Sequence, residues 1–415
     1  MDSTRTLDEA AVRGILAGVR DPELGASIVD LGMLRDVEVS PDGDVRVKVA
    51  LTTAGCPLRG QIKADVISKV HGLAGVRNVE VDYAEMTQAE RSAVMQRARL
   101  EATRRAPETE VGATTRVIAI ASGKGGVGKS SVTVNLATAL AAQGRAVGVL
   151  DADIWGFSIP RMLGVAGRLG AVRDERVAAD ARGAAPGKIA PAEIEVANLD
   201  DPKGPTGRLA VVSMGLLVDD EDTALMWRGL ILSKALEQFL TDVRWGELDY
   251  LLLDMPPGTG DIQMALSRLL PQTEMLVVTT PAKNAQKVAA RVADMARRSY
   301  LKVLGIVENM SEFVAPDGSR HAIFGQGGGK RLAALTGAPL IGRIPIEPAV
   351  SSGGDDGNPV VLAAPDGPAA TEFRRIARLI VDELLPPVEM AGCTARILDL
   401  ATRAASALPG PNGAA

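Results

Sequence analysis

The segment that most constrains the fold of this chain is the run GKGGVGKS at residues 123–130, which fits the phosphate-binding pattern G-x-x-x-x-G-K-[ST]. An apolar run at 117–121 precedes this loop, and residues 131–143 follow it with apolar side chains at helical spacing. Glycine-rich loops between a strand and a helix present backbone N–H groups and the helix N-terminus to phosphate oxygens. The sequence therefore predicts a strand–loop–helix unit that binds a nucleotide.

The side chains of this loop have distinct expected roles. Lys129 should neutralise the β- and γ-phosphate oxygens, and the Ser130 hydroxyl should be a ligand of Mg²⁺. A second lysine, Lys124, adds another cation to the loop. A separate segment, PPGTGD at 256–261, is expected to sense the γ-phosphate and to move when it is lost. The residues expected to contact the nucleotide here are Gly123, Lys124, Gly125, Gly126, Val127, Gly128, Lys129, Ser130 and Ser131.

Acidic residues end two of the predicted strands. The apolar run at 250–253 ends at Asp254, and the run at 147–150 ends at Asp151 and Asp153. Because the carboxyl ends of parallel strands meet at one edge of a sheet, these acids should converge near the loop. We expect Asp254 beside the water shell of Mg²⁺ and Asp151 in the outer shell of that ion, whereas Asp153 should orient or deprotonate the attacking water. A carboxylate that only caps a turn is the alternative at each position.

Continuous apolar runs alternate with helical stretches beyond residue 116, which is typical of a parallel sheet covered by helices on both faces. The runs lie at 117–121, 146–150, 210–213, 250–253, 275–279, 303–307 and 340–344. Residues 164–207 interrupt the pattern with a stretch of little periodicity, which predicts a mobile surface insertion or a lid. The expected fold class is α/β, a P-loop NTPase with a mostly parallel, helix-covered sheet, preceded by a small α/β domain.

The same patterns divide the chain into four regions. They are a small α/β domain at 1–85, a helical or flexible linker at 86–115, the P-loop domain at 116–385 and a partly disordered C-terminal tail at 386–415. The small domain should contain helices at 8–19 and 58–71 and strands at 34–39, 45–51 and 76–81.

Charge and cysteine content narrow the possible partners and compartment. With 46 Lys and Arg against 51 Asp and Glu, the net charge of −5 does not favour nucleic acid. Cys56 and Cys393 are too few for a disulfide scaffold, and the start of the chain lacks the apolar core of a signal peptide. Since no uninterrupted apolar run is long enough to cross a bilayer, we expect a cytoplasmic protein without a membrane partner.

Taken together, several motifs resemble the Mrp/ApbC family, deviant P-loop ATPases of the MinD/ParA superclass that act as iron–sulfur cluster carriers. These motifs are Lys124, DADIWGFSIP at 151–160, WRG at 227–229, WGELDY at 245–250, PPGTGD at 256–261 and VENMS at 307–311. Through DPELG at 21–25, DLG at 30–32 and LTTAGCP at 51–57, the first domain resembles the small iron–sulfur assembly domain often fused ahead of such ATPases.

The resemblance implies a homodimer that binds ATP and Mg²⁺, hydrolyses ATP, and assembles [4Fe–4S] clusters or delivers them to client or scaffold proteins. It also implies that Lys124 crosses the dimer interface to the nucleotide of the partner, and that Asn309 hydrogen-bonds the adenine. The catalytic residues expected are then Lys124, Lys129 and Asp153.

The chain departs from this family at the cluster site. Ala315 and Gly318 stand where many members carry Cys-x-x-Cys, so the thiolates that would bridge a cluster between two subunits are absent. Cys56 is a possible iron–sulfur ligand, because a helix N-terminus favours the thiolate, and a small buried side chain is its alternative. His321 is expected to be a surface or packing residue, and Cys393 incidental.

Three functions therefore stay open. The first is an ATPase that assembles or delivers iron–sulfur clusters. The second is a ParA/MinD-like positioning or scaffold ATPase that transfers no metal, which the replacements at Ala315 and Gly318 favour. The third assigns the metal or partner chemistry to the first domain through Cys56, with the ATPase as its regulator.

Overall fold

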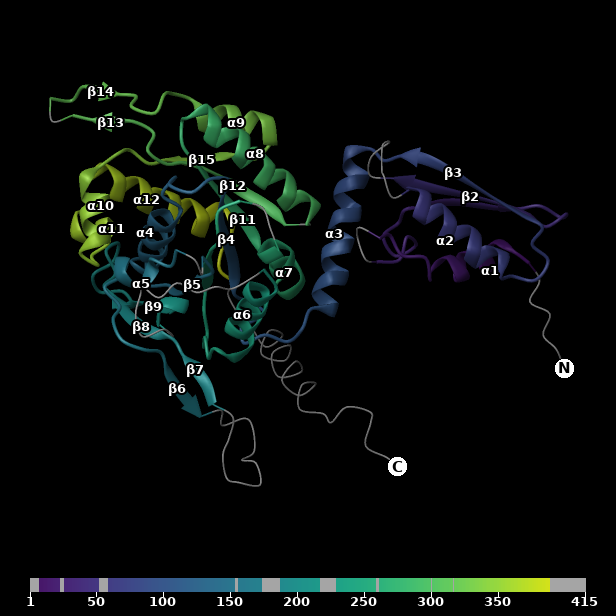
Figure 1. The fold of residues 1–415 in the computed structure, drawn as a ribbon, viewed down its shortest axis with the longest axis horizontal. Coiled ribbons are helices and arrows are strands. Elements are labelled where there is room, and N and C mark those ends of the chain that lie inside the picture. The colour runs from purple at the N-terminus through teal and green to yellow at the C-terminus, as the bar shows by residue number, and fades with distance from the viewer. Residues whose placement is uncertain are drawn as a thin grey trace. The chain divides into compact units, whose positions relative to one another are not determined.

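The computed structural model describes residues 7–22, 26–51, 59–153, 156–173, 187–216, 229–258, 261–299, 301–315 and 317–388 (Figure 1). Its contacts separate two compact units. The first comprises Met1–Pro107 with Leu266–Gln272, and the second comprises Glu108–Ala265 with Thr273–Ala415. The predicted tail lies outside the described residues beyond position 388.

The first unit is built on a three-stranded sheet of β1 (Leu34–Val39), β2 (Asp44–Leu51) and β3 (Asn78–Glu85). Strand β1 pairs antiparallel with β2, and β2 pairs parallel with β3. Alternate side chains of β2 face the core, as a strand with one buried face requires. Helices α1 (Glu9–Leu16) and α2 (Arg59–His71) contribute further apolar side chains to this core.

The segment predicted as a linker contains helix α3 (Gln88–Arg105). Val94 and Ala98, four residues apart on one helical face, are buried in the core of the first unit together with Met86. This helix is therefore part of the first unit and does more than connect two domains. The sequence gives little sign of this packing, because the buried apolar side chains described on α3 are few and not large.

The second unit contains an eight-stranded sheet with the order β15-β12-β11-β4-β10-β5-β9-β8. Its strands are β4 (Arg116–Ser122), β5 (Ala146–Asp151), β8 (Ala192–Val196), β9 (Gly207–Ser213), β10 (Tyr250–Asp254), β11 (Glu274–Thr279), β12 (Lys302–Glu308) and β15 (Leu340–Arg343). All neighbouring pairs are parallel except β8 with β9. The predicted α/β class with a mostly parallel sheet is confirmed.

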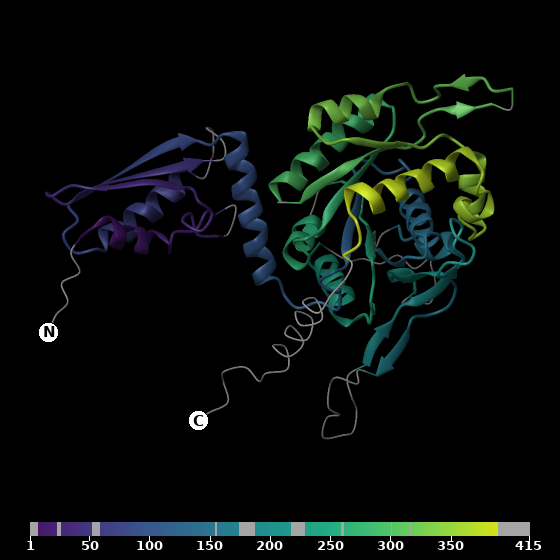
Figure 2. The ribbon, with the colours of Figure 1, turned by 180° about the vertical axis from the view of Figure 1, so that it is seen from behind.

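Helices cover both sides of this sheet, as Figures 1 and 2 show from opposite directions. They are α4 (Lys129–Ala141), α5 (Ile159–Met162), α6 (Gly229–Asp242), α7 (Asp261–Leu269), α8 (Lys283–Arg298), α9 (Gly328–Thr336), α10 (Pro348–Asp355), α11 (Val360–Ala363) and α12 (Pro368–Leu379), with short turns at Met214–Leu216 and Ile380–Leu384. No helix among the described residues is both long and apolar enough to span a bilayer.

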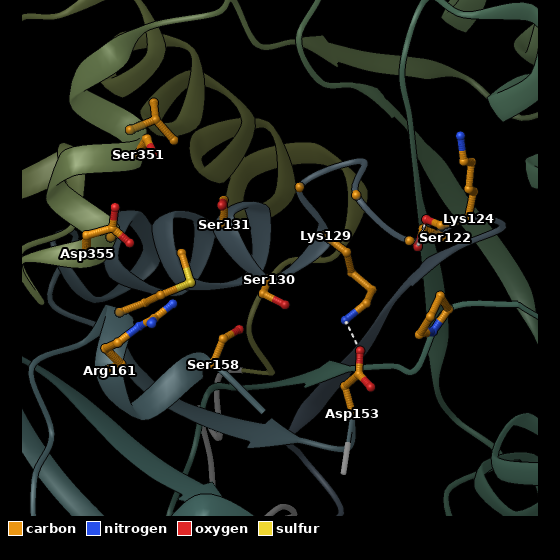
Figure 3. A pocket seen from close by; sticks show the side chains of 17 residues that line it. Ser122, Lys124, Lys129, Ser130, Ser131, Asp153, Ser158, Arg161, Ser351 and Asp355 are labelled. Carbon is orange, nitrogen blue, oxygen red and sulfur yellow. Dashed lines mark hydrogen bonds and ion pairs between the residues drawn. The ribbon is translucent and has the colours of Figure 1, made fainter. Parts of the chain in front are cut away.

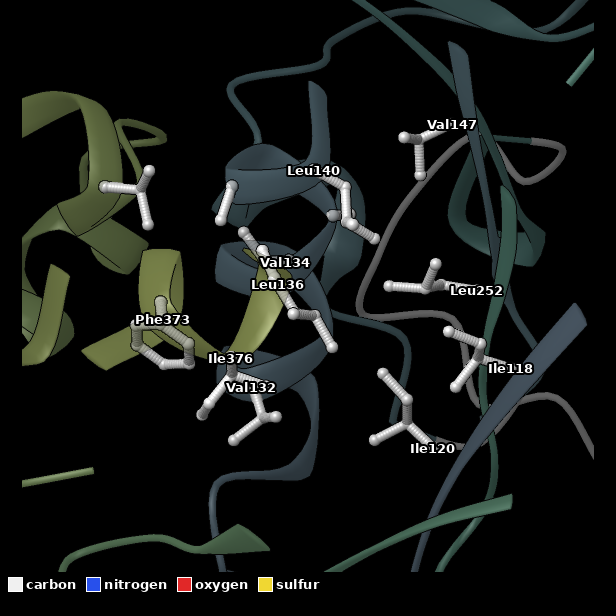
Figure 4. Packing of buried hydrophobic residues seen from close by; sticks show 14 of the residues in the cluster. Ile118, Ile120, Val132, Val134, Leu136, Leu140, Val147, Leu252, Phe373 and Ile376 are labelled. Atoms are coloured by element: carbon white, nitrogen blue, oxygen red, sulfur yellow. The ribbon is translucent and has the colours of Figure 1, made fainter. Parts of the chain in front are cut away.

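Helix α4 lies at the centre of the larger core. Leu136 and Leu140 of this helix face the strand residues Ile118 and Leu252, while Phe373 of α12 packs on its other side (Figure 4). Because α4 is surrounded in this way, its apolar residues are not restricted to one stripe. The helix that follows the phosphate loop is thereby fixed on both sides.

The stretch at 164–207, predicted as a surface insertion of little periodicity, contributes three strands among its described residues. Strands β6 (Gly170–Arg173) and β7 (Gly187–Ala190) form an antiparallel ribbon, and β8 extends the main sheet. These strands have four or five residues each, which is too short for a clear alternating pattern.

The opposite edge of the sheet, β15, is covered by side chains of α12. The N–H of Arg343 donates to Glu372 Oε1 at 2.8 Å, and Arg375 Nη2 donates to the carbonyl of Ile341 at 2.5 Å. Arg375 and Glu372 are also ion-paired with each other. Two backbone groups that an additional strand would use are therefore already bonded.

Candidate nucleotide site

The loop between β4 and α4 can form only because several of its positions are glycine. Gly126 and Gly128 have φ angles of 77° and 79°, in the left-handed region, and Gly128 caps the N-terminus of α4. A Cβ on Gly123 would collide with the backbone of Val288. The loop thus needs glycine for its left-handed turns and for the close packing of Gly123 against the backbone of α8.

A cavity of about 310 Å³ opens beside this loop and extends to α5 and α10 (Figure 3). The predicted residues that line it are Lys124, Gly125, Gly126, Gly128, Lys129, Ser130, Ser131 and Asp153. The predicted residues that do not are Gly123, Val127, Asp151, Asp254 and Asn309. The structure therefore brings most of the predicted loop and one predicted acid to a single cavity.

Lys129 lies at the centre of a buried charged cluster. Its Nζ is 2.8 Å from Asp254 Oδ1 and 3.4 Å from Asp153 Oδ2, and its side chain is only 7% exposed. Asp254 also accepts hydrogen bonds from Ser130 Oγ at 2.6 Å and from Thr133 Oγ1 at 2.9 Å. Within the described residues, Nζ has ion pairs but no directed hydrogen bond. The ammonium is therefore held at the cavity wall with donor capacity left for an anion.

Asp151 and Asp153 occupy different positions, because the strand ends at Asp151 and the chain then turns. Asp151 is fully buried and accepts bonds from Asp153 N at 3.2 Å, Ser158 N at 3.2 Å and Ser213 Oγ at 3.1 Å. Burial raises the pKa of Asp151 to about 7, and the negative charge of Asp254 contributes. Asp151 thus supports the turn that carries Asp153, behind the cavity wall.

Asp153 faces the cavity and points toward Lys129 in Figure 3. Burial raises the pKa of the Asp153 carboxyl, and the nearby Lys129 charge opposes that rise. Its side chain is 15% exposed, so water can reach it. A carboxylate that is partly desolvated and accessible is suited to accept a proton.

The segment after Asp254 borders the same cavity. Pro257 is a lining residue, and the N–H of Gly258 donates to the carbonyl of Ser122 at 2.9 Å. The end of β4 and this segment are thus directly connected. Residues 259–260 of the predicted γ-phosphate sensor lie outside the described residues.

Asn309 is placed behind the phosphate loop. Its Nδ2 donates to the carbonyl of Val127 at 2.9 Å, and its side chain is buried. The structure thus shows a bond from Asn309 to the loop, and the predicted contact with adenine stays a prediction.

The expected cluster position forms a small hairpin of β13 (Phe313–Val314) and β14 (Arg320–His321). The N–H of Ala315 donates to the carbonyl of Ser319 at 2.9 Å, and Gly318 is in the left-handed region. His321 is exposed, and its Nε2 lies 2.9 Å from Ser319 Oγ. Both cysteines of the chain, Cys56 and Cys393, lie outside the described residues.

Several polar residues of the site lie outside the motifs that predicted it. Thr133 lies one turn after Lys129, and Ser213 is the register partner of Asp151 on the neighbouring strand. Thr133 could have been predicted to lie near Asp254, because it follows Lys129 by four residues on the same helix. Ser213 could not, because its contact with Asp151 depends on the pairing of β9 with β5. Arg161, one residue after the motif at 151–160, and Asp355 line the far wall of the cavity on α5 and α10.

Two family models match most of the chain. A family model described as NUBPL iron-transfer P-loop NTPase matches residues 113–381, and one described as iron-sulfur cluster assembly protein matches residues 9–82. The iron-sulfur cluster carrier protein of Mycobacterium leprae is 42% identical over 376 residues, which are 89% of this chain and 91% of that protein. The protein of the same name from Deinococcus radiodurans is 40% identical over 386 residues, 91% of this chain and 96% of that protein.

Among solved structures, the nucleotide-binding protein of Archaeoglobus fulgidus in complex with ADP is 31% identical, with a TM-score of 0.48 over 66% of this chain and 96% of that chain. The resemblance to the Mrp/ApbC carriers is confirmed by the family models and the curated relatives, so the chain belongs to the family of NUBPL-type iron-transfer P-loop NTPases, with an iron–sulfur cluster assembly domain ahead of the NTPase.

Proposed function

We propose that this protein is a Mg²⁺-dependent ATP hydrolase whose nucleotide state controls the assembly or delivery of iron–sulfur clusters in the cytoplasm. The observation that carries the proposal is the buried Lys129–Asp254–Ser130 cluster beside a phosphate loop and an open cavity. The iron–sulfur part is supported by the names of relatives that align along about nine tenths of the chain.

The residues present fit a bound Mg²⁺ ion. Ser130 Oγ and Asp254 Oδ2 lie 2.6 Å apart, and both are hard oxygen donors beside the loop. We assign Ser130 as a ligand, Asp254 to the water shell and Asp151 to the outer shell. When bound, Mg²⁺ neutralises negative charge on the phosphate oxygens.

The side chains of this chain supply the remaining chemistry. Lys129 places a positive charge where charge develops on the transferred phosphoryl group, and the glycine-rich loop offers backbone donors to the same oxygens. Asp153, across from Lys129, orients the attacking water or accepts its proton. The products are ADP and inorganic phosphate.

Lys124 is assigned to the nucleotide of a partner subunit in a homodimer. Its side chain is exposed and projects away from Lys129 in Figure 3. Within the described part of the chain, its ammonium has no ion pair or hydrogen bond, so it is available to a second copy. A cation supplied in this way acts like an arginine finger, which contributes about 10³ to 10⁵ in rate.

Replacement of Lys124 tests the hydrolase proposal. Lys124→Ala should lower ATP turnover by about 10³-fold or more while calorimetry still detects ATP binding, because Lys129 remains. Lys203→Ala, on an exposed loop far along the chain from the site, is the matched control and should retain parental turnover. Parental turnover in Lys124→Ala would exclude the assignment in trans.

A second function, a positioning or scaffold ATPase that moves no metal, is favoured by one observation. The hairpin at 313–321 offers Ala315 and Gly318 where the carriers place thiolates. Anaerobic reconstitution with iron and sulfide separates the two functions through the visible absorbance of the protein. A chromophore that is lost in Cys56→Ser but kept in Cys393→Ser supports the carrier, and no chromophore in the parent supports the scaffold.

A further inference from the structure

The amide of Asn309 is bonded to the phosphate loop from behind. Nδ2 donates to the carbonyl of Val127 at 2.9 Å, and the side chain is 7% exposed. The contact is tight, since a Cβ on Gly128 would collide with this same Nδ2. The backbone of Asn309 is anchored as well, through its N–H to the carbonyl of Thr279 at 2.8 Å.

The next residue, Met310, has a φ of 53°, the only non-glycine residue of the described chain with a positive φ. Such a conformation persists only where the surroundings fix it. Here the N–H of Ser311 donates to the carbonyl of Ile344 at 2.9 Å, and the N–H of Ile344 donates to the carbonyl of Glu308 at 2.9 Å. Asn309 therefore projects from a rigid segment.

The bond to Val127 has a consequence that follows from peptide geometry. In a planar trans peptide, the carbonyl of Val127 and the N–H of Gly128 point in opposite directions. Holding that carbonyl toward Asn309 turns the N–H of Gly128 away from Asn309. Gly128 lines the nucleotide cavity, whereas Val127 and Asn309 do not.

We propose that Asn309 is a positioning residue that orients the Val127–Gly128 peptide so that the Gly128 N–H is presented to a phosphate group. The inference rests on the proposed nucleotide site and adds a role that does not involve the base. An adenine contact made by Asn309 would affect only ligands that carry adenine. If Asn309 orients the loop, its loss should weaken the binding of every polyphosphate, whether or not it carries a base.

Inorganic tripolyphosphate with Mg²⁺ is the probe that distinguishes these roles, because it has no base. In Asn309→Ala, the dissociation constants for ATP, GTP and tripolyphosphate should rise by a similar factor of about tenfold, the effect of one lost hydrogen bond to a buried carbonyl. Asn358→Ala, an exposed asparagine outside the cavity lining, should bind all three like the parent. The amide resonance of Gly128 should shift with tripolyphosphate in the parent and shift less in Asn309→Ala.

Three results would overturn the inference. Parental affinity of Asn309→Ala for tripolyphosphate, with only ATP weakened, would make Asn309 an adenine contact alone. An unchanged Gly128 response would show that its N–H does not depend on Asn309. If the parent protein bound neither ATP nor tripolyphosphate, the proposed nucleotide site itself would be wrong. That result would be seen before any variant is made. Asn309→Leu keeps similar volume without the donor, and gives the same test if Asn309→Ala does not fold.

Discussion

Asp254 is the residue on which the charged cluster depends, since it is ion-paired with Lys129 and accepts hydrogen bonds from Ser130 and Thr133. All three partners lie in the first turns of α4, and the carboxylate comes from the end of β10 next to β4. The parallel register of these two strands therefore decides the geometry of the site. A buried carboxylate with this many partners is rigid, which favours a defined phosphate position.

Removing the Thr133 hydroxyl should weaken nucleotide binding. Thr133→Val deletes the bond to Asp254 Oδ1 and leaves the carboxylate less firmly oriented, so ATP affinity should fall by about fivefold, close to 1 kcal/mol. Thr138→Val is a matched control, because its hydroxyl is equally buried on α4 but bonds only the carbonyl of Val134. Titration calorimetry measures both. Equal affinity of the two variants would show that Thr133 does not orient Asp254.

Asp153→Asn should separate hydrolysis from binding. The amide cannot accept a proton from water, so turnover should fall by about 10² to 10⁴-fold while ATP affinity stays within a few fold. Asp356→Asn, an exposed residue outside the cavity lining, makes the same charge change and should not alter turnover. A phosphate-release assay compares them. Parental turnover in Asp153→Asn would show that a group other than Asp153 orients the attacking water.

Much of this site was predictable from the sequence, because its parts are local. The loop lysine, the serine after it and the acid at the end of a strand follow directly from motif and strand pattern. The sequence does not predict that Asp153 lines the cavity while Asp151 is buried behind its wall. This difference depends on where the strand ends and on Ser213 from a neighbouring strand. The Asn309 bond to Val127 joins positions 182 residues apart, and no pattern in the sequence indicates it.

Asp200, in the loop before β9, forms ion pairs with two arginines of helix α12. Asp200 Oδ1 accepts from Arg374 Nη2 at 2.7 Å and from Arg378 Nη2 at 2.8 Å. The hydrogen bond from Arg378 lowers the pKa of Asp200, and Arg374 lowers it further. Burial of the carboxyl opposes this shift. A carboxyl whose pKa is lowered on folding stabilises the fold at neutral pH and loses that contribution as the pH falls through its folded-state pKa.

Asp200→Asn should therefore reduce the acid sensitivity of this unit. With a side chain 31% exposed, the pair contributes about 0.5–1 kcal/mol near neutral pH, and the parent and variant should converge in stability as the medium is acidified below the usual aspartate range. Melting curves across this pH range provide the measurement, with Asp201→Asn as a neighbouring control. A constant difference at every pH would mean that ionisation of Asp200 is not involved.

The contact of α12 with α4 should dominate the stability of the second unit. Phe373 is almost fully buried against α4, so Phe373→Ala should cost about 3–5 kcal/mol through lost burial and a residual cavity. Chemical denaturation followed by circular dichroism measures the loss. Leu362→Ala, at a partly exposed site on α11, should cost far less. Similar losses in the two variants would show that the α12 contact is not central.

Long apolar strands were predictable, whereas short or half-exposed elements were not. The strands β4, β10 and β11 are buried over nearly their whole length, which gives uninterrupted apolar runs in the sequence. By contrast, β8 has partly or fully exposed side chains at its first four positions and a buried one only at Val196, and its pairing with β9 provides the evidence for this strand. Of the described side chains of α3, Val94 and Ala98 join the core of the first unit, and two such residues give no clear helical period in the sequence.

At the scale of the whole molecule, the two units contain separate apolar clusters of described residues. Because ATP is proposed to bind only the second unit, saturating nucleotide should raise the melting temperature of that unit alone. At 100 times the dissociation constant, the stabilisation is about 2.7 kcal/mol. Differential scanning calorimetry with and without Mg²⁺ and ATP should show two transitions, of which one moves. Equal shifts of both transitions would reveal energetic coupling between the units.

The bonds from Glu372 and Arg375 to β15 restrict how copies of this protein can associate. A neighbouring chain that tried to continue the sheet would first have to displace two charged side chains from the Ile341 carbonyl and the Arg343 amide. This arrangement disfavours the growth of fibres by strand pairing at β15, even in concentrated solution. For the same reason, we expect two subunits of a dimer to associate through a surface other than this edge.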